Sequence, residues 1–173
     1  MGGYGSGRWG WHSKKTIVED CLQLDTRHLK REKLLGWGLH WSGAWLWKRG
    51  EEVTSSIGLE VDMTDRARPW VRLFYELKRS GQEVDYKIAL QTTRPALGGD
   101  LWWFTCPAQG CGRRVRKLYL PPGAVHFACR HCYHLTYRSC QESHIYDSLF
   151  GRIGAKLGYS ADQVARLLRV RWG

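Results

Sequence analysis

The feature of this chain that most restricts its fold is a set of four cysteines arranged as two close pairs. Cys106 and Cys111 are separated by four residues, Cys129 and Cys132 by two, and 17 residues lie between the pairs. Short cysteine spacings let one tight turn present two thiolates, and Zn²⁺ in structural sites takes four such ligands in a tetrahedron. The spacing therefore predicts one structural zinc ion, and a reduced cluster without metal is the alternative.

The segment between the two cysteine pairs has the composition of a β-hairpin. Residues 115–120 and 125–129 read as two strands, joined by a Pro-Pro-Gly turn at residues 121–123, and residues 101–105 read as a third strand. A hairpin that connects two cysteine turns is the geometry of a zinc ribbon. We therefore predict a zinc ribbon over residues 98–140.

This segment resembles the zinc-ribbon superfamily, through Cys-Pro-Ala-Gln-Gly-Cys-Gly at residues 106–112 and Cys-Arg-His-Cys at residues 129–132. Residues 98–140 are also similar to short zinc-ribbon proteins, of no settled activity, carried by bacterial phages, plasmids and integrative elements. Two departures from the common pattern are the four-residue spacing of the first pair and Tyr133 in a place often taken by Gly. The number of ligands is unchanged by either departure.

Other candidate ligands lie near the four cysteines. Cys140 and His144 are four residues apart and could share one face of a helix, but two ligands do not make a metal site. A catalytic zinc needs an open coordination position and a general base, and no Asp or Glu lies between Asp100 and Glu142. We therefore expect a closed structural site and no enzymatic activity. The remaining candidate ligands are His126, His131 and His134.

Positive charge is concentrated in the C-terminal part of the chain. Residues 101–173 carry 11 Lys or Arg and 3 Asp or Glu, whereas residues 36–100 carry 9 of each. A positive field confined to one region indicates a polyanionic partner, although a basic surface can also serve only solubility. We predict contacts with nucleic-acid phosphates, and a docking surface for an acidic protein is the alternative. The candidate contact residues on the predicted ribbon are Arg113, Arg114, Arg116, Lys117, Arg130 and Arg138.

Residues 141–173 are predicted to form a basic helical hairpin. A first helix over residues 142–157 carries apolar side chains at four-residue spacing, and Ser160 caps a second helix. The pair resembles a helix-turn-helix, whose second helix enters the major groove of DNA, and the alternative is a hairpin that only packs. The residues assigned to base and phosphate contacts are Gln163, Arg166, Arg169 and Arg171.

The pattern of residues 16–97 predicts a helix that covers an antiparallel sheet. Asp25 is a good N-cap, and apolar residues follow it at helical spacing until Gly36. Residues 41–92 then alternate apolar and polar side chains in four segments, which is typical of strands. The tryptophans of the first segment belong either to the core or to a stacking platform for unpaired bases. They are Trp41, Trp45 and Trp47.

The fold class predicted from these patterns is α+β: a helix plus a four-stranded antiparallel meander, followed by a zinc ribbon and a C-terminal helical hairpin. A length of 173 residues suits one main core with a small appended module. We expect four parts in chain order: a flexible Gly-rich basic arm (1–15), a helix-and-sheet domain (16–97), the zinc ribbon (98–140) and the basic helical hairpin (141–173).

The sequence carries no sign of membrane insertion or secretion. No apolar run approaches the ~20 residues needed to cross a bilayer, and the Gly-rich N-terminus lacks the apolar region of a secretory signal. We therefore expect a cytoplasmic protein with no membrane partner and no small-molecule substrate. The leading hypothesis is a non-enzymatic, zinc-stabilised nucleic-acid-binding protein of a mobile genetic element, with DNA favoured over RNA. The alternative is a protein-binding inhibitor or adaptor that acts on a host nucleic-acid-handling or defence complex.

Overall fold

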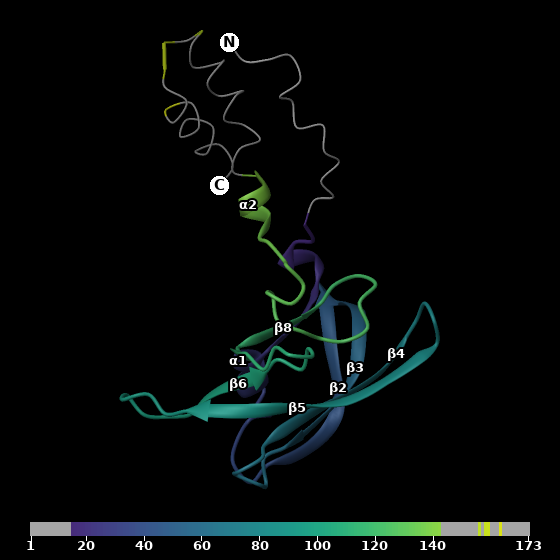
Figure 1. The fold of residues 1–173 in the computed structure, drawn as a ribbon, viewed down its shortest axis with the longest axis vertical. Helices are drawn as coiled ribbons and strands as arrows, with labels where there is room; N and C mark the ends of the chain where they lie inside the picture. The colour runs from purple at the N-terminus through teal and green to yellow at the C-terminus, as the bar shows by residue number, and fades with distance from the viewer. Residues whose placement is uncertain (1–14, 143–155, 157, 160–162, 164–173) are drawn as a thin grey trace.

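The described part of the molecule consists mainly of β-strands. The structure is a computed structural model that describes residues 15–142, 156, 158–159 and 163. Within these residues the two α-helices, α1 (Thr26–Arg31) and α2 (Arg138–Glu142), have six and five residues. The predicted α+β class is therefore wrong, because the fold is a curled antiparallel sheet with only short helical pieces (Figure 1).

The main sheet has six antiparallel strands in chain order. They are β2 (His40–Arg49), β3 (Glu52–Asp62), β4 (Trp70–Leu77), β5 (Gln82–Thr93), β6 (Leu101–Thr105) and β7 (Arg114–Val115). The four alternating segments are strands β2 to β5, but they do not form a separate four-stranded meander. Strand β5 continues to Thr93, which pairs with Leu101 of β6, and β7 then pairs with β6. The sheet therefore extends into the segment predicted to be a ribbon.

The core lies inside the curl of this sheet. Along β3 the side chains of Leu59 and Val61 are fully buried, as the period of two requires. Leu29 of α1 and Phe127, from beyond the sheet, belong to the same apolar cluster as Leu59. Residues on both sides of the predicted boundary at 97/98 thus share one core.

The helix predicted to run from Asp25 toward Gly36 is short. Asp25 caps it as expected, since its carboxylate accepts a hydrogen bond from the Arg27 N–H at 2.9 Å. The helix ends at Arg31 because Lys33 adopts a left-handed conformation, with φ of 59°. A short 3-10 helix, η1 (Val18–Asp20), and strand β1 (Leu22–Asp25) precede it.

The predicted hairpin between the cysteine pairs is only partly formed. Strand β8 (Lys117–Leu120) pairs along its length with β1, which sequence reasoning missed. The predicted return strand contacts β8 through a single bridge between Tyr119 and Ala128. Its neighbour Phe127 is fully buried and donates its N–H to the Tyr86 hydroxyl at 2.8 Å, so this segment packs into the core instead of extending a ladder.

The remaining predictions about organisation fall largely beyond the described residues. The basic helical hairpin (141–173) and the Gly-rich arm (1–15) lie outside them, apart from Lys15, Lys156, Gln163 and a few neighbours. Across the portion of the chain that can be described, no helix combines the length and apolar character that a membrane span requires.

Candidate metal centre and basic surface

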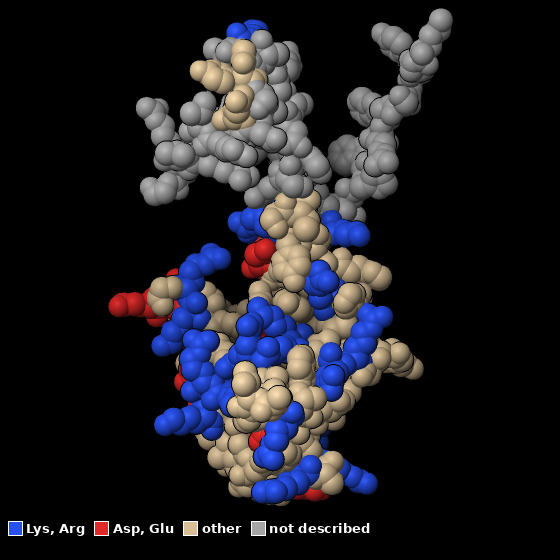
Figure 2. Space-filling model, turned by 90° about the vertical axis from the view of Figure 1, so that its left-hand side faces the viewer, with Lys and Arg blue, Asp and Glu red and all other residues tan. Residues whose placement is uncertain are grey.

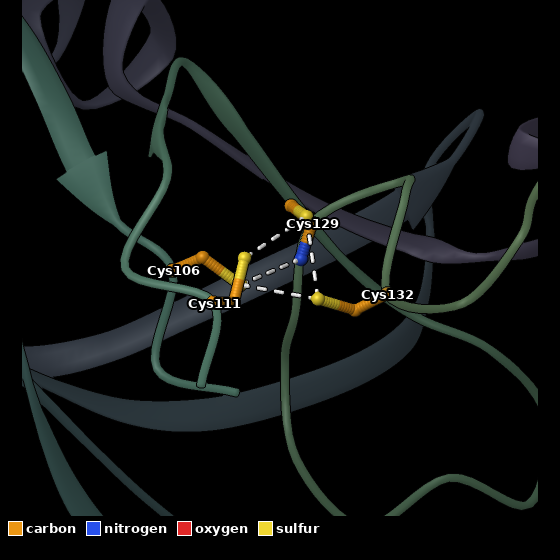
Figure 3. A group of neighbouring side chains, drawn as sticks. All are labelled: Cys106, Cys111, Cys129 and Cys132. Carbon is orange, nitrogen blue, oxygen red and sulfur yellow. Dashed lines mark hydrogen bonds between the residues drawn. The ribbon is translucent and has the colours of Figure 1, made fainter. Parts of the chain in front are cut away.

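The four predicted cysteine ligands converge on one point. Their sulfur atoms all lie within 4.8 Å of one another. The separations are 3.9 Å for Cys106–Cys132, 3.9 Å for Cys111–Cys129 and 3.5 Å for Cys129–Cys132. A regular tetrahedron of metal–sulfur bonds of about 2.3 Å has sulfur–sulfur edges of about 3.8 Å, whereas a disulfide would need about 2.0 Å. The cluster therefore has the dimensions of a four-coordinate metal site (Figure 3).

Two turns present these thiols, one after β6 and one after residue 128. In the first turn the Cys111 N–H donates to the Ala108 carbonyl at 3.0 Å, and Gly110 takes a φ of 71°. A left-handed φ suits glycine, so Gly110 lets the longer four-residue spacing close. In the second turn the Leu135 N–H donates to the Arg130 carbonyl at 3.0 Å. All four thiols therefore converge despite the four-residue spacing of the first pair and the presence of Tyr133.

Burial and backbone hydrogen bonds set the electrostatics of the cluster. Cys106 and Cys129 are only 3% and 1% exposed, and the Cys129 N–H donates to the Cys106 sulfur at 3.3 Å. Burial raises the pKa values of the Cys106 and Cys132 thiols, while the backbone N–H of Arg113 lowers the pKa of Cys111 to about 7. Buried thiolates need a compensating positive charge, and a metal cation at their centre would supply it.

The histidines near the cluster do not join it. Among the described residues, the four cysteines are the complete metal-ligand group. His131 lines a shallow hollow of about 310 Å³ beside Cys111 and Cys132. His126 instead packs its ring edge-on against Tyr86, with centroids 5.0 Å apart. His134 and Cys140 are exposed, and His144 lies outside the described residues.

Two of the predicted phosphate-contacting residues lie against a tryptophan of the sheet. The guanidinium groups of Arg114 and Arg116 are each 5.2 Å from the centroid of the Trp103 ring. The indole N–H of Trp103 donates to the Thr93 hydroxyl at 2.9 Å, and Nε of Arg116 is buried without a hydrogen-bond partner. We call Trp103, Arg114 and Arg116 the β6 surface.

Sequence reasoning missed Trp103, although the signal was present. In the run Leu-Trp-Trp-Phe-Thr, alternation along a strand sends Trp102 and Phe104 to the same side. These two are 3% and 0% exposed in the structure, whereas Trp103 is only half-buried on the other face. Trp45 of β2, at 8% exposed, belongs to the core cluster.

The other predicted contact residues are dispersed. Lys117 lies 3.8 Å from the Asp25 carboxylate, and Arg138 pairs with Asp20 at 3.5 Å, so both charges are partly compensated. Arg130 lies over the exposed Tyr137 ring at 5.1 Å. Arg113 is exposed beside the metal cluster. Gln163 is helical and exposed, while Arg166, Arg169 and Arg171 lie outside the described residues.

Lys and Arg side chains crowd one face of the molecule. Figure 2 shows them gathered across its middle, on the side toward which the β5–β6 connection extends in Figure 1. A face with this charge can attract a polyanion. Comparisons with models of protein families, with curated proteins and with solved structures found no match to this chain.

Proposed function

We propose that this chain is a non-enzymatic nucleic-acid-binding protein whose basic surface is held in shape by one zinc ion. The observation that carries the proposal is the position of Arg114 and Arg116 over Trp103, shortly after the first cysteine turn of a four-sulfur cluster of tetrahedral dimensions. Four soft sulfur donors favour zinc, and a complete set of four leaves no open position for a reacting water. The resemblance of residues 98–140 to proteins of mobile genetic elements supplies the proposed source.

The metal would act on the basic residues through the backbone that joins them. Cys106 follows directly after β6, and its N–H donates to the Arg113 carbonyl at 2.8 Å. The next residue, Arg114, pairs with Thr105 in the two-residue strand β7. So short a strand has little stability of its own, because it pairs at only two positions. A metal that joins Cys106 to Cys111 would close the intervening loop and keep β7 beside β6.

Trp103 prepares the two arginines for phosphate binding. A guanidinium over an indole gains about 0.5–1 kcal/mol at an exposed site and loses side-chain freedom before any ligand arrives. The exposed Arg114 can form paired hydrogen bonds with phosphate oxygens, whereas Arg116, whose Nε is buried, can offer only its Nη groups. The surplus of +8 in residues 101–173 adds long-range attraction for a polyanion. We propose DNA ahead of RNA as the physiological target.

A salt titration of nucleic-acid binding tests this function. Fluorescence anisotropy of a labelled oligonucleotide is followed from 50 to 300 mM salt, for the wild type and for the double variant Arg114→Ala/Arg116→Ala. The logarithm of affinity should fall linearly with the logarithm of salt, by about 0.9 per phosphate neutralised on duplex DNA. The double variant should bind more weakly and show a slope smaller by about 2.

A matched control separates specific contacts from total charge. Lys78→Ala/Arg79→Ala removes the same charge from the exposed β4–β5 turn, which lies far from α1 and β6 in Figure 1. Its binding should stay close to that of the wild type. No binding at 50–100 mM salt, or an affinity nearly independent of salt, would refute the proposal. A stoichiometric protein partner retained from nuclease-treated lysate would then favour the adaptor alternative.

A further inference from the structure

A second basic feature shares no residue with the β6 surface. It is a groove of about 500 Å³ between the β1–α1 segment and strand β2. The side chains that matter here are His28, Arg31, Trp45, Trp47, Lys48 and Lys117. Ligand-holding clefts in proteins commonly measure about 300–1,000 Å³, so the groove is large enough for one nucleotide.

The groove carries an excess of positive charge. Four cations line it, including Arg27, against one carboxylate, that of Asp25. Asp25 is already engaged by Arg27 at 3.0 Å and by Lys117 at 3.8 Å. Arg31 and Lys48 have no carboxylate within ion-pair distance among residues 15–140. The groove therefore offers two uncompensated cations to an anionic group.

Aromatic rings and an open strand edge lie beside these charges. The His28 ring stands edge-on to Trp45, with centroids 5.0 Å apart. The Trp47 indole N–H donates to the Gln23 carbonyl at 2.9 Å, so its polar atom is satisfied. One face of its ring stacks on Phe127, with centroids 6.1 Å apart, which leaves only the other side for an apolar contact. Strand β2 is the last strand of the sheet, and no described strand pairs with its second edge.

We propose that this groove holds an unpaired nucleotide of a single-stranded nucleic acid. The phosphate lies at Arg31 and Lys48, and the base contacts the exposed His28 ring and the half-buried Trp47 ring. A duplex keeps its bases paired and stacked inside, so it cannot place a base here, whereas a single strand can. Single-stranded DNA and RNA share this chemistry. The inference rests on the proposed function, because it assigns the kind of nucleic acid that the protein binds.

The test compares four anionic probes. They are oligo(dT) and oligo(U) of equal length, a blunt DNA duplex and poly-glutamate, each measured with the wild type, Arg31→Ala/Lys48→Ala and the control Lys78→Ala/Arg79→Ala. Both replaced groove side chains are exposed and have no acidic partner, so the variant should fold, which circular dichroism checks. For at least one of the two single strands, affinity should fall roughly tenfold and the salt slope by about 0.7, for the one phosphate that the two cations hold. The affinity of the groove variant for duplex DNA and for poly-glutamate should fall no further than that of the control variant.

Photo-crosslinking locates the base. A single-stranded oligonucleotide that carries one 5-iodouracil is irradiated on the wild-type protein, and the modified peptides are identified by mass spectrometry. The expected adducts are on His28 or Trp47. Adducts confined to Trp103 or to residues outside the groove would overturn the proposal.

The outcomes separate this inference from the function on which it rests. If the wild type binds no nucleic acid, the proposed function fails and the groove assignment fails with it. If the wild type binds a single strand but the groove variant binds as tightly as the control variant, only the groove assignment is wrong. Equal losses for all four probes would reduce the groove to a general electrostatic contact and would also overturn the assignment.

Discussion

At the scale of single residues, the two halves of the metal cluster have different surroundings. Cys106 and Cys129 are buried and belong to the main apolar cluster, whereas Cys111 and Cys132 are half-buried and line a shallow hollow. Loss of a buried ligand would leave the other thiols without the cation that balances them and would disturb the core at the same point. The buried ligands are therefore the more informative positions to change.

Cys129→Ser should abolish metal binding and destabilise the protein. Metal content should fall from about one zinc ion per chain to near zero, and the free energy of unfolding should fall by about 4 kcal/mol or more, as for other lost metal ligands. Elemental analysis and urea unfolding measure the two effects. Cys140→Ser is the matched control, since Cys140 is exposed and outside the cluster. Unchanged stability in Cys129→Ser would mean that the metal is not structural.

Asp25 joins the N-terminus of α1 to the proposed groove. Burial opposes ionisation of its carboxyl, but hydrogen bonds from Arg27 and the charges of Arg27 and Lys117 hold its pKa below the usual value. Asp25→Ala should cost about 0.5–2 kcal/mol of unfolding free energy, because the helix loses its N-cap. Asp25→Asn keeps an oxygen that can cap and should cost less. Equal costs for the two variants in chemical denaturation would show that capping is not the stabilising contact.

The metal ligands could be predicted from sequence because their signal is local. Two short spacings suffice to identify Cys106, Cys111, Cys129 and Cys132 as neighbours. The partner that a basic side chain contacts depends instead on parts of the chain that are distant in sequence. Arg138, for example, was predicted to contact phosphate, yet its partner Asp20 lies near the other end of the described chain.

At the scale of secondary structure, alternation located the strands but not their partners. The apolar periods of β3, β4 and β5 are visible in the sequence because each strand has one buried face. Strand β1 has only four residues, and Ile17, Cys21 and Leu24 follow the i, i+4, i+7 spacing of a helix, so no clear sign of the pairing between β1 and β8 is visible in the sequence. Which strands pair with each other depends on the apolar core that the whole chain forms.

A tight contact between β3 and β4 gives a test of this sheet. Gly58 lies opposite Phe74, and a Cβ at Gly58 would come 1.9 Å from Cε2 of that ring. Gly58→Ala should therefore destabilise the protein by about 1–2 kcal/mol by displacing the ring. In a Phe74→Ala background the same change should be neutral or stabilising, since glycine is a poor strand residue. Additive effects in urea unfolding would contradict the close packing.

At the scale of the whole molecule, metal and nucleic acid should be coupled. One apolar cluster contains Leu59 of the sheet together with Cys106 and Cys129, and the basic residues of the β6 surface follow directly from the first cysteine turn. Disorder around the cysteines should thus spread to Arg114 and Arg116. The two properties proposed for this protein are therefore not independent.

Removal of the metal should weaken nucleic-acid binding. Protein treated with a zinc chelator should bind an oligonucleotide at least about tenfold more weakly at fixed salt, because β7 loses the closure that orders it. One equivalent of zinc should restore the affinity, and Cys140→Ser should respond as the wild type does. Anisotropy measures all three. Full affinity after verified removal of the metal would assign binding to parts of the protein that do not depend on it.

The open edge of β2 has a practical consequence for anyone handling this protein. A bare strand edge can pair with the same edge of another molecule, and natural proteins discourage this with charged side chains. Lys48 and Arg49 end this strand, and Arg31 lies across the groove from it. At 1 M salt such repulsion is screened beyond about 3 Å. Concentrated stocks should therefore be kept at low ionic strength, since the high-salt buffers used to strip nucleic acid would remove the barrier to self-association.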